Sequence, residues 1–288
     1  MGIDLKFAVA VKSEINGISS LKDKELVKHE LKGYLISSNI KNKKTKTQFV
    51  TENEYNINRF SKLLKNLNID HNINIGGKKY VIDIKQKEYE NKTKDIIQIN
   101  PQNVEQEKAL IRGIFMGSGT INDPNKVYHL EMAIKENDEI TKIKEIIQNF
   151  GINIKTFEKD NQYIIYIKQA EDISGFLALI GANKAVISFE EIRIKREMNG
   201  KINRIVNCKT ANLSKTLNSS IDEIKAINKL KQIGKFSGLD DTLKEIGNLR
   251  LENPDMPLIE IAKLTNPPIG KSGANYRLKK LMRLANEE

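Results

Sequence analysis

The stretch "ALIRGIFMGSGTI", from Ala109 to Ile121, decides how the rest of the chain is interpreted. Its apolar residues are spaced as in a helix, and the run closes on Gly117, Ser118 and Gly119. Such an end resembles the start of an active site, where a catalytic side chain would project. No acid, histidine or cysteine stands there, so the segment has the shape of a catalytic element without its chemistry.

The same pattern occurs twice in the chain. "HELKGYLISSNI" (His29 to Ile40) aligns with "KALIRGIFMGSGTI" (Lys108 to Ile121) when Gly33 is placed on Gly113, at an offset of 80 residues. Two further pairs of blocks repeat in the same order, and the three pairs together indicate an internal duplication. The two later blocks repeat at an offset of 83, with the three extra residues in the turn "NDPNK" (Asn122 to Lys126): "LLKNLNI" (Leu63 to Ile69) with "IIQNFGI" (Ile146 to Ile152), and "YVIDIK" (Tyr80 to Lys85) with "YIIYIK" (Tyr163 to Lys168).

Each copy has the pattern of an α+β unit, with a helix, a strand, a helix, two strands and a helix. In the first copy, the glycines of "IGGKK" (Ile75 to Lys79) provide a hairpin turn. Two such units predict pseudo-symmetric halves, in which Gly33 and Gly113 let the leading helices approach closely. The predicted elements of the second copy are Val104 to Gly117, Val127 to Ile134, Asp138 to Phe150, Ile152 to Phe157, Tyr163 to Lys168 and Ala170 to Ile180.

With these two motifs the chain resembles the single-chain LAGLIDADG homing endonucleases, whose nine-residue motif aligns with "LKGYLISSN" (Leu31 to Asn39) and "IRGIFMGSG" (Ile111 to Gly119). The resemblance implies a carboxylate at the eighth motif position of each copy, which holds divalent metal for DNA cleavage. Ser38 and Ser118 stand at these positions, and Asp123 is the only acid near the second motif. Because a serine hydroxyl is uncharged and a poor ligand for a hard cation, we expect no catalytic residue, no metal and no cofactor.

The charge of the chain favours a polyanionic partner. Its net charge is +11 at pH 7 and its pI is near 9.4, values for which nucleic acid is the usual partner. An AT-rich genome that spreads lysines over the surface would give the same total. The charge is concentrated, however, because the segment from Arg193 to Lys235 contains eleven Lys or Arg residues and three acidic residues. A concentrated charge favours a binding surface.

The remaining composition excludes other classes. The 288 residues, 39% of them hydrophobic, suffice for two or three folded units. No apolar run reaches the length of a membrane span, and Lys12 and Glu14 interrupt the N-terminal apolar patch, so we expect a cytoplasmic, nucleoid-associated protein without a secretory signal. Cys208 is predicted to be a small buried packing residue, and His129, in the strand pattern "VYHLEMAI", to lie on a sheet surface.

The C-terminal segment predicts three helices in helix-turn-helix order. They cover Asp241 to Glu252 and Leu258 to Leu264, followed by a third helix for which Ser272 is a suitable N-cap. Ala274, Leu278, Leu281 and Ala285 form the expected core face of the third helix. The residues predicted to bind DNA lie in the same segment: Lys271, Ser272, Asn275, Tyr276, Arg277, Lys279, Lys280 and Arg283.

Three blocks carry a resemblance that extends over the whole chain: "YHLEMAI" (Tyr128 to Ile134), "NRIVNCKTANLSKT" (Asn203 to Thr216) and "IGKSGANYRL" (Ile269 to Leu278). With them the chain resembles the WhiA family of bacterial transcription regulators. This resemblance implies a degenerate LAGLIDADG-like domain tethered to a helix-turn-helix similar to the promoter-reading region of sigma factors. It also implies a role in sporulation, or in cell division and chromosome organisation. Gly270 departs from the serine expected at its position.

The block "NRIVNCKTANLSKT" admits two interpretations. Its polar residues either contact DNA phosphates between the domains, or cap helices and fill an interdomain contact. Both interpretations stay open at this point. The residues concerned, together with one neighbouring arginine, are Arg196, Arg204, Asn207, Lys209, Asn212 and Lys215.

The expected fold class is therefore α+β, with a duplicated, pseudo-two-fold LAGLIDADG-like domain followed by an all-α helix-turn-helix domain. The expected division is residues 1–100 and 101–196 for the two repeats, 197–219 for a basic linker and 220–288 for the helix-turn-helix domain. We expect a non-catalytic, sequence-selective regulator of transcription that binds double-stranded DNA and no membrane. The alternatives are a LAGLIDADG-type endonuclease and a non-specific architectural nucleic-acid-binding protein. RNA polymerase or another regulator as a partner, and the oligomeric state, are left open.

Overall fold

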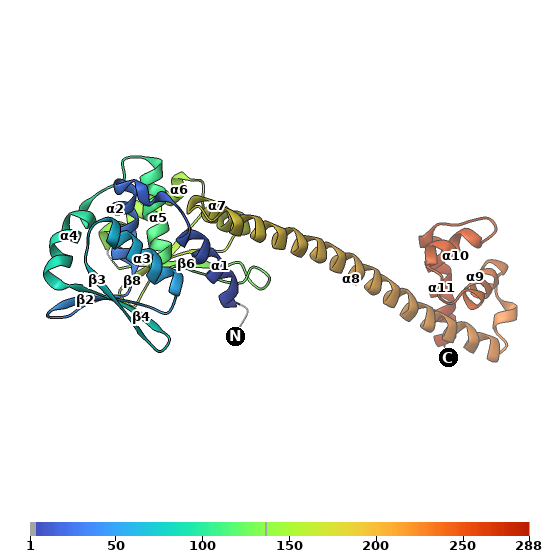
Figure 1. Cartoon of the computed structure of the whole chain (residues 1–288). Helices are drawn as coiled ribbons and strands as arrows, with labels where there is room; N and C mark the ends of the chain where they lie inside the picture. Colours follow the sequence, from blue (N-terminus) through green and yellow to red (C-terminus); the bar gives the residue numbers. More distant parts are fainter. Residues whose placement is uncertain (1–3, 136, 288) are drawn as a thin grey trace. The chain divides into compact units, whose positions relative to one another are not determined.

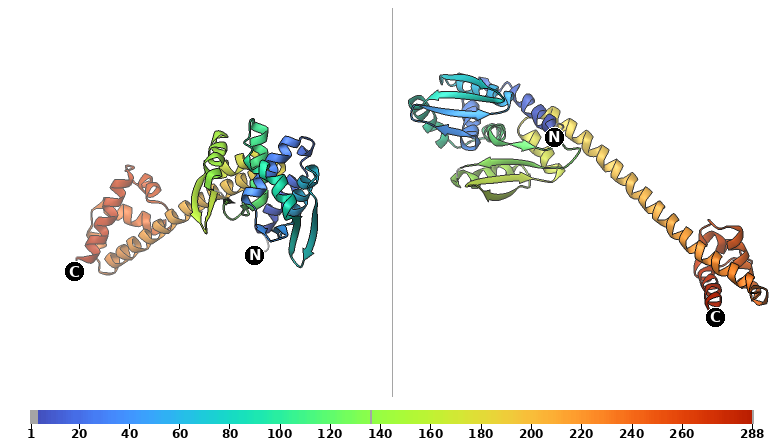
Figure 2. Two further views of the ribbon diagram at one scale, coloured as in Figure 1. Left: turned by 90° about the vertical axis from the view of Figure 1, so that its left-hand side faces the viewer. Right: turned by 90° about the horizontal axis from the view of Figure 1, so that it is seen from below.

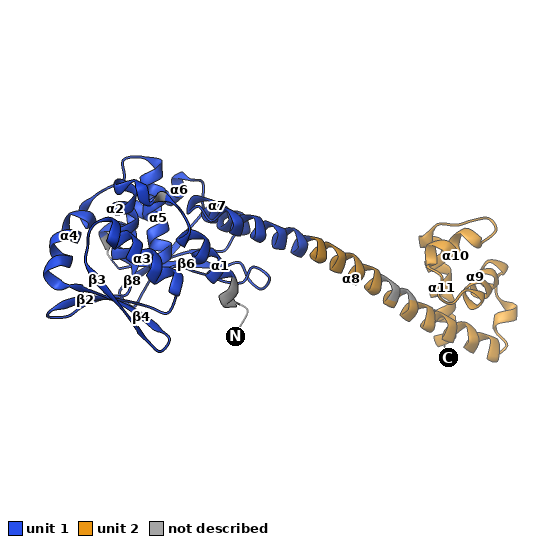
Figure 3. Cartoon of the chain, in the orientation of Figure 1, with its two compact units in different colours: residues 1–197 blue, residues 198–288 orange. Residues whose placement is uncertain are grey.

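The computed structural model describes residues 4–135 and 137–287, which form two compact units. Unit 1 lies within residues 1–197 and unit 2 within residues 198–288 (Figure 3). Among the described residues, no helix combines the length and the apolar character that crossing a membrane requires.

Unit 1 contains two copies of one sequence of elements, most of which are labelled in Figure 1. The first copy consists of α2 (Lys24–Ser37), β1 (Ile40–Asn42), β2 (Lys46–Thr51), α3 (Glu54–Asn66), β3 (His71–Gly76), β4 (Lys79–Lys85) and α4 (Gln86–Gln98). The second consists of α5 (Val104–Ser118), β5 (Thr120–Ile121), β6 (Leu130–Ile134), α6 (Asn137–Asn149), β7 (Lys155–Lys159), β8 (Gln162–Ile167) and α7 (Ala170–Leu179).

The two copies have the same sheet topology. Each sheet is antiparallel and four-stranded, in the order β1-β2-β4-β3 in the first copy and β5-β6-β8-β7 in the second. In the central pairs, Phe49 lies opposite Ile82 and Met132 opposite Ile165, and all four side chains are buried. The two sheets are separate, as Figure 2 shows in blue to cyan and in green. The predicted α+β duplication is confirmed.

Local signals explain where the helices and turns begin. The Asp23 side chain accepts a hydrogen bond from the backbone N–H of Glu25 at 2.8 Å and so caps α2. Asn103 caps α5 in the same way. The β3–β4 hairpin turns at Gly77, whose φ is 62°, and Asn161, with φ of 57°, turns the β7–β8 hairpin.

The leading helices α2 and α5 pack backbone to backbone at Gly33 and Gly113. A Cβ atom on Gly33 would lie 2.6 Å from the backbone N of Ile114, and one on Gly113 would overlap the carbonyl of Glu30. Even alanine is too large for either position unless the helices move apart. The close approach predicted from the two motif glycines is confirmed.

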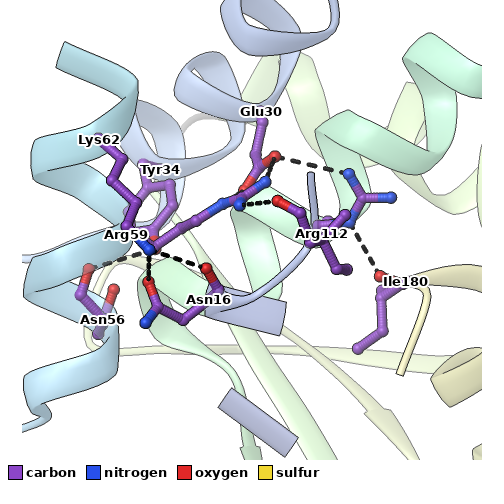
Figure 4. A network of polar contacts seen from close by, with 9 residues as sticks. Asn16, Glu30, Tyr34, Asn56, Arg59, Lys62, Arg112 and Ile180 are labelled. Atoms are coloured by element: carbon purple, nitrogen blue, oxygen red, sulfur yellow. Dashed lines mark hydrogen bonds and ion pairs between the residues drawn. The ribbon is translucent and has the colours of Figure 1, made fainter. Parts of the chain in front are cut away.

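A buried charge network joins α2, α3 and α5 beside this contact (Figure 4). The Glu30 carboxylate accepts hydrogen bonds from Nε and Nη2 of Arg59, both at 2.7 Å, and from Nη1 of Arg112 at 3.5 Å. Arg59 also donates to the carbonyl of Ile18 at 2.7 Å, and Arg112 donates to that of Ile180 at 2.9 Å. Desolvation lowers the pKa of Arg59, but hydrogen bonding and the charge of Glu30 outweigh it and raise that pKa.

A second buried ion pair crosses between the copies. Lys32, which directly precedes Gly33, donates to Glu139 on α6 and to the carbonyl of Ile99, at 3.0 and 2.9 Å. Arg112 directly precedes Gly113 and reaches Glu30 of the first copy. Each motif helix therefore extends a cation from beside its glycine to an acid of the other copy. Removing one partner would leave the other charge buried and uncompensated, which is costly.

Helix α1 (Asp4–Asn16), the turn η1 (Ser20–Lys22) and the start of α8 (Asn183–Gln232) complete unit 1. The Glu14 carboxylate accepts hydrogen bonds from the backbone N–H groups of Lys184 and Ala185, at 2.7 and 3.0 Å. Because the first N–H groups of a helix have no intrahelical partner, Glu14 caps α8 from α1.

Unit 2 is all helical. After the last turns of α8 come η2 (Phe236–Gly238), α9 (Asp241–Glu252), α10 (Leu258–Leu264) and α11 (Lys271–Asn286). The bounds of α9 and α10 agree with the prediction, and the expected core face of α11 is buried. Ile227 and Leu230 of α8 belong to the same core, so the end of α8 packs with α9, α10 and α11 as the fourth helix of this unit.

Several local expectations need correction. Gly270, and not Ser272, is the N-cap of α11, and its helix begins at Lys271. The strand expected from Val127 begins at Leu130, because residues 122–129 form the turn and the approach to β6. Strands β1 and β5 were not predicted. Residues 197–219 lie inside α8, which runs without interruption for 50 residues.

We predict that Gly113→Ala lowers the free energy of unfolding by about 1–3 kcal/mol, because the added methyl group overlaps the Glu30 carbonyl. Urea unfolding measures this. The matched control is Gly175→Ala in α7, where a Cβ would make ordinary contact, 3.6 Å from Ile152. The control should leave stability unchanged or raise it by up to about 1 kcal/mol. Equal stability of the two variants would contradict the packing of α2 against α5.

Candidate functional site

Helices α10 and α11 form the second and third helices of a helix-turn-helix. The turn between them is closed by the Thr265 hydroxyl, which contacts the carbonyls of Ala262 and Pro267 at 2.9 and 3.0 Å. The backbone N–H of Ile269 also donates to Ala262 at 2.9 Å. Ala274 and Leu278 are buried below this turn, so α11 has a fixed inner face and presents its other side to solvent.

The solvent side of α11 is polar, basic and aromatic. Tyr276 is 67% exposed, a high value for a large aromatic side chain. Asn275 precedes it in the second turn of the helix. Residues predicted from the sequence to bind DNA lie exposed on this helix: Lys271, Ser272, Asn275, Tyr276, Lys279, Lys280 and Arg283.

Arg277 is placed differently from the other predicted DNA-binding residues. It is half-buried, and its guanidinium lies 3.9 Å from the carboxylate of Glu245 on α9. The same carboxylate accepts a hydrogen bond from the backbone N–H of Asn266 at 2.7 Å. Arg277 therefore ties α11 to α9 and to the turn.

The basic segment of α8 is divided between the two units. Arg196 packs on unit 1, where its guanidinium lies 4.3 Å from the centre of the Tyr128 ring and donates to the carbonyls of Pro124 and Lys126. In unit 2, Arg204, Asn207, Lys209 and Lys215 are exposed along the helix. The side chain of Asn212 lies outside the described residues.

Cys208 is exposed, which contradicts its predicted burial. Residues 201–211 of α8 are all exposed, so this stretch has no core into which a small side chain packs. His129 lies just before β6, half-buried, with its Nε2 3.1 Å from the Glu131 carboxylate. This agrees with the expected place at the sheet surface.

At the C-terminal ends of α2 and α5 stand the two serines of the motif. The Ser38 hydroxyl is completely buried and has no hydrogen-bond partner among the described residues. A Cβ on Gly117 would lie 2.6 Å from it, so α5 closes the space beside Ser38. The Ser118 hydroxyl donates to the carbonyl of Ala133 at 2.8 Å and accepts from its N–H at 2.9 Å. The Ser38 hydroxyl is therefore shut off from solvent, whereas the half-buried Ser118 hydroxyl is hydrogen-bonded to the backbone of β6.

Two lysines for which the sequence predicted no role at the motif helices lie near them. The Lys135 amine donates to the carbonyl of Ser38, at the end of α2 where the helix dipole favours a cation. Burial lowers the pKa of Lys135. The Lys12 amine lies 5.7 Å from the centre of the Phe115 ring on α5, and burial lowers its pKa from 10.5 to about 8.

The residues at the helix ends do not fit a divalent metal. Their donors are two neutral hydroxyls, and an ammonium group already binds the Ser38 carbonyl, whereas Mg²⁺ and similar cations prefer carboxylates. Asp123 is buried and accepts hydrogen bonds from the backbone and side chain of Asn125, both at 2.9 Å. The backbone hydrogen bond holds the pKa of Asp123 below its ordinary value. Its carboxylate therefore fixes the turn before β6.

The solvent faces of the two sheets differ at equivalent positions. In the first, the Asp83 carboxylate accepts hydrogen bonds from Lys46 at 2.7 Å and Gln48 at 2.6 Å. In the second, Tyr166 stands at the matching place and packs edge-on against Phe157, with ring centres 5.6 Å apart. One face thus carries a carboxylate paired with a lysine at its centre, and the other is aromatic.

Fold and surface together define the class: a degenerate LAGLIDADG-like unit followed by a helix-turn-helix. A family model described as the WhiA LAGLIDADG-like domain matches residues 107–199, and one described as the WhiA C-terminal HTH domain matches residues 202–285. The chain belongs to the WhiA family.

Individual relatives agree with this assignment. A "Probable cell division protein WhiA" of Clostridium acetobutylicum is 42% identical over 67% of this chain, and the match spans 61% of that relative's length. A relative with the same name in Alkaliphilus metalliredigens is 36% identical over 84% of this chain and 78% of its own length. The crystal structure of full-length WhiA from Thermotoga maritima superposes with a TM-score of 0.64 at 25% identity, covering 97% of this chain and 98% of that chain.

The low pKa of Lys12 predicts a pH dependence of stability. Since the folded state disfavours the charged amine, folding is penalised below about pH 8, and the penalty disappears as pH rises towards 10.5. We predict that Lys12→Met raises the free energy of unfolding at neutral pH by about 1–3 kcal/mol, since one pKa unit corresponds to about 1.4 kcal/mol. Urea unfolding measures the difference from wild type, which should shrink above pH 8. The exposed Lys24→Met is the control, and a constant difference at all pH values would refute the assignment.

Proposed function

We propose that this protein is a non-catalytic, sequence-selective regulator of transcription that binds double-stranded DNA. The observation that carries the proposal is the solvent face of α11, which is polar, aromatic and basic on a helix whose other face is fixed in a core. In a helix-turn-helix the third helix enters the major groove, where side chains near its start read base edges. Asn275 and Tyr276 suit that role, and Lys279, Lys280 and Arg283 suit phosphate neutralisation.

The names of the relatives support a wider role. The curated relatives are named cell division proteins, so we propose that the regulated genes serve cell division and chromosome segregation, with sporulation as a further role in organisms that sporulate. The protein then acts at the nucleoid in the cytoplasm. An RNA polymerase contact is compatible with a transcription regulator and is part of the proposal.

The two kinds of residue on α11 should respond differently to substitution. Asn275→Ala should weaken binding to a duplex selected by the full chain from a random pool by about 1–3 kcal/mol, and should barely change binding to random duplex, because only a matched base loses its partner. Lys280→Ala should weaken binding to both, and should reduce the slope of log affinity against log salt by about one. Fluorescence anisotropy at several salt concentrations measures both effects.

Matched controls are available in the same unit. Asn286, at the last position of α11, and Lys235, after α8, are exposed, and Asn286→Ala and Lys235→Ala should leave selectivity unchanged. If Asn275→Ala weakened selected and random DNA equally, α11 would not read bases. Equal affinity of the wild type for all duplexes would favour the architectural alternative.

The uncharged serines at the ends of α2 and α5 argue against the endonuclease alternative. We predict that the purified protein does not nick supercoiled plasmid in Mg²⁺ or Mn²⁺, even in excess over DNA, because neither Ser38 nor Ser118 provides an anionic ligand. Gel electrophoresis of the plasmid measures nicking. Cleavage that follows the protein through purification and stops on addition of a chelator would show that the protein is an enzyme.

A further inference from the structure

A pocket of about 290 Å³ opens in unit 2 at the start of α11. It is lined by residues from four helices, so it is a product of the packing of the whole unit. Lys215 and Ser219 come from α8, one turn apart on the same face. Lys271 and Asn275 face it from α11, one turn apart on that helix. The remaining lining residues are Glu223, Arg250, Pro257, Leu258 and Ile259.

The charges around this pocket favour an anion. Lys215 and Lys271 are exposed amines from two different helices. Glu223 is the acid among the lining residues, and its carboxylate lies 2.7 Å from Nε of Arg250, with both side chains buried. The opposite charges of Glu223 and Arg250 cancel, so the two lysines give the pocket a net positive charge. Gly270 caps α11 without a side-chain acceptor, which leaves the first N–H groups of that helix open.

The floor of the pocket is held in place by further hydrogen bonds. Nη1 of Arg250 donates to the carbonyl of Met256 at 2.8 Å, and the buried Ser220 hydroxyl donates to that of Pro254. Both bonds fix the turn between α9 and α10 against α8 and α9. The pocket is therefore formed before any ligand binds, and its ordering costs little free energy on binding.

We propose that this pocket holds one backbone phosphate of the DNA, while Asn275 at its edge faces the adjoining base. The proposal rests on the proposed function and extends the interface to α8, outside the helix-turn-helix. Arg204 and Asn207 precede Lys215 by 11 and 8 residues, spacings that place them on the same face of α8 by helical periodicity. The phosphate contact fixes the position of α11, and the base contact supplies the selectivity.

The experiment uses the full chain and two short duplexes, one selected by the protein from a random pool and one random. Lys215→Ala and Lys271→Ala should weaken binding to both duplexes equally. Each should reduce the slope of log affinity against log salt by about one. Between about 50 and 200 mM salt, the fold-loss of affinity of each variant should therefore be about threefold smaller than that of the wild type. Lys215→Arg should keep the wild-type slope. The matched control is Lys225→Ala, because this exposed lysine of α8 lines a different pocket, beside the last turn of α11, and should have no effect.

Chemical neutralisation of the DNA locates the contact. Each phosphate of the selected duplex is replaced in turn by an uncharged methylphosphonate. For the wild type, we expect one position near the base read by Asn275 at which replacement weakens binding several-fold. In Lys215→Ala the same replacement should have a clearly smaller effect, because one of the two lysines that bind this phosphate is already absent. Circular dichroism and thermal melting confirm that each variant is folded.

The outcomes separate this proposal from the proposed function. If Asn275→Ala abolishes base selectivity but Lys215→Ala keeps the wild-type salt slope and methylphosphonate map, the phosphate site is refuted and the reading helix stands. If Lys215→Ala acts as expected while Asn275→Ala leaves selectivity intact, the phosphate site stands and the reading helix is refuted. Titration with inorganic phosphate is the third arm: binding that depends on Lys215, without any response to methylphosphonates, would assign the pocket to a free anion and overturn the DNA contact.

Discussion

The contact between Gly33 and Gly113 is the constraint on which unit 1 depends. At that point the backbones of α2 and α5 touch without intervening side chains, which fixes both the distance and the angle between the two copies. The charged side chains beside the glycines then have partners within reach, with Glu30 between two arginines and Lys32 against Glu139. A wider helix pair would leave these charges buried and separated, so glycine packing and the ion pairs support one another.

Much of the fold was predictable because its signals are local. The repeated glycine motifs, the hairpin glycine and the apolar periodicity of the C-terminal helices predicted the duplication and gave α9 and α10 their observed bounds. Strands β1 and β5, of three and two residues, are too short to show periodicity. The stretch 197–219 has few core positions, and its helical state in α8 carries no amphipathic signature. The pair Lys32 and Glu139 lies 107 residues apart, and only the folded chain brings it together.

The candidate surfaces, too, were predictable where the signal is local and not where it depends on contacts made only in the folded chain. Periodicity alone identifies which residues of α11 face solvent, since the core positions leave the other face exposed. It does not show that Arg277 pairs with Glu245, or that Lys215 of α8 lies beside the start of α11. The serines at the motif positions were evident from the sequence. The close approach of Gly117 to the Ser38 hydroxyl, and the hydrogen bond from Lys135 to the Ser38 carbonyl, were not.

The unequal charges on the two motif helices have a consequence for a divided chain. The segment between α4 and α5, residues 99–103, joins the copies without belonging to either. If the chain were cut there, each fragment would expose a glycine-faced helix, and two identical fragments would be able to pair through it. Pairing of the first copy with itself would bury Glu30 without Arg112, and Lys32 without Glu139. The asymmetry therefore favours pairing of each half with the other over pairing with itself, although Glu30 would keep Arg59 of its own copy.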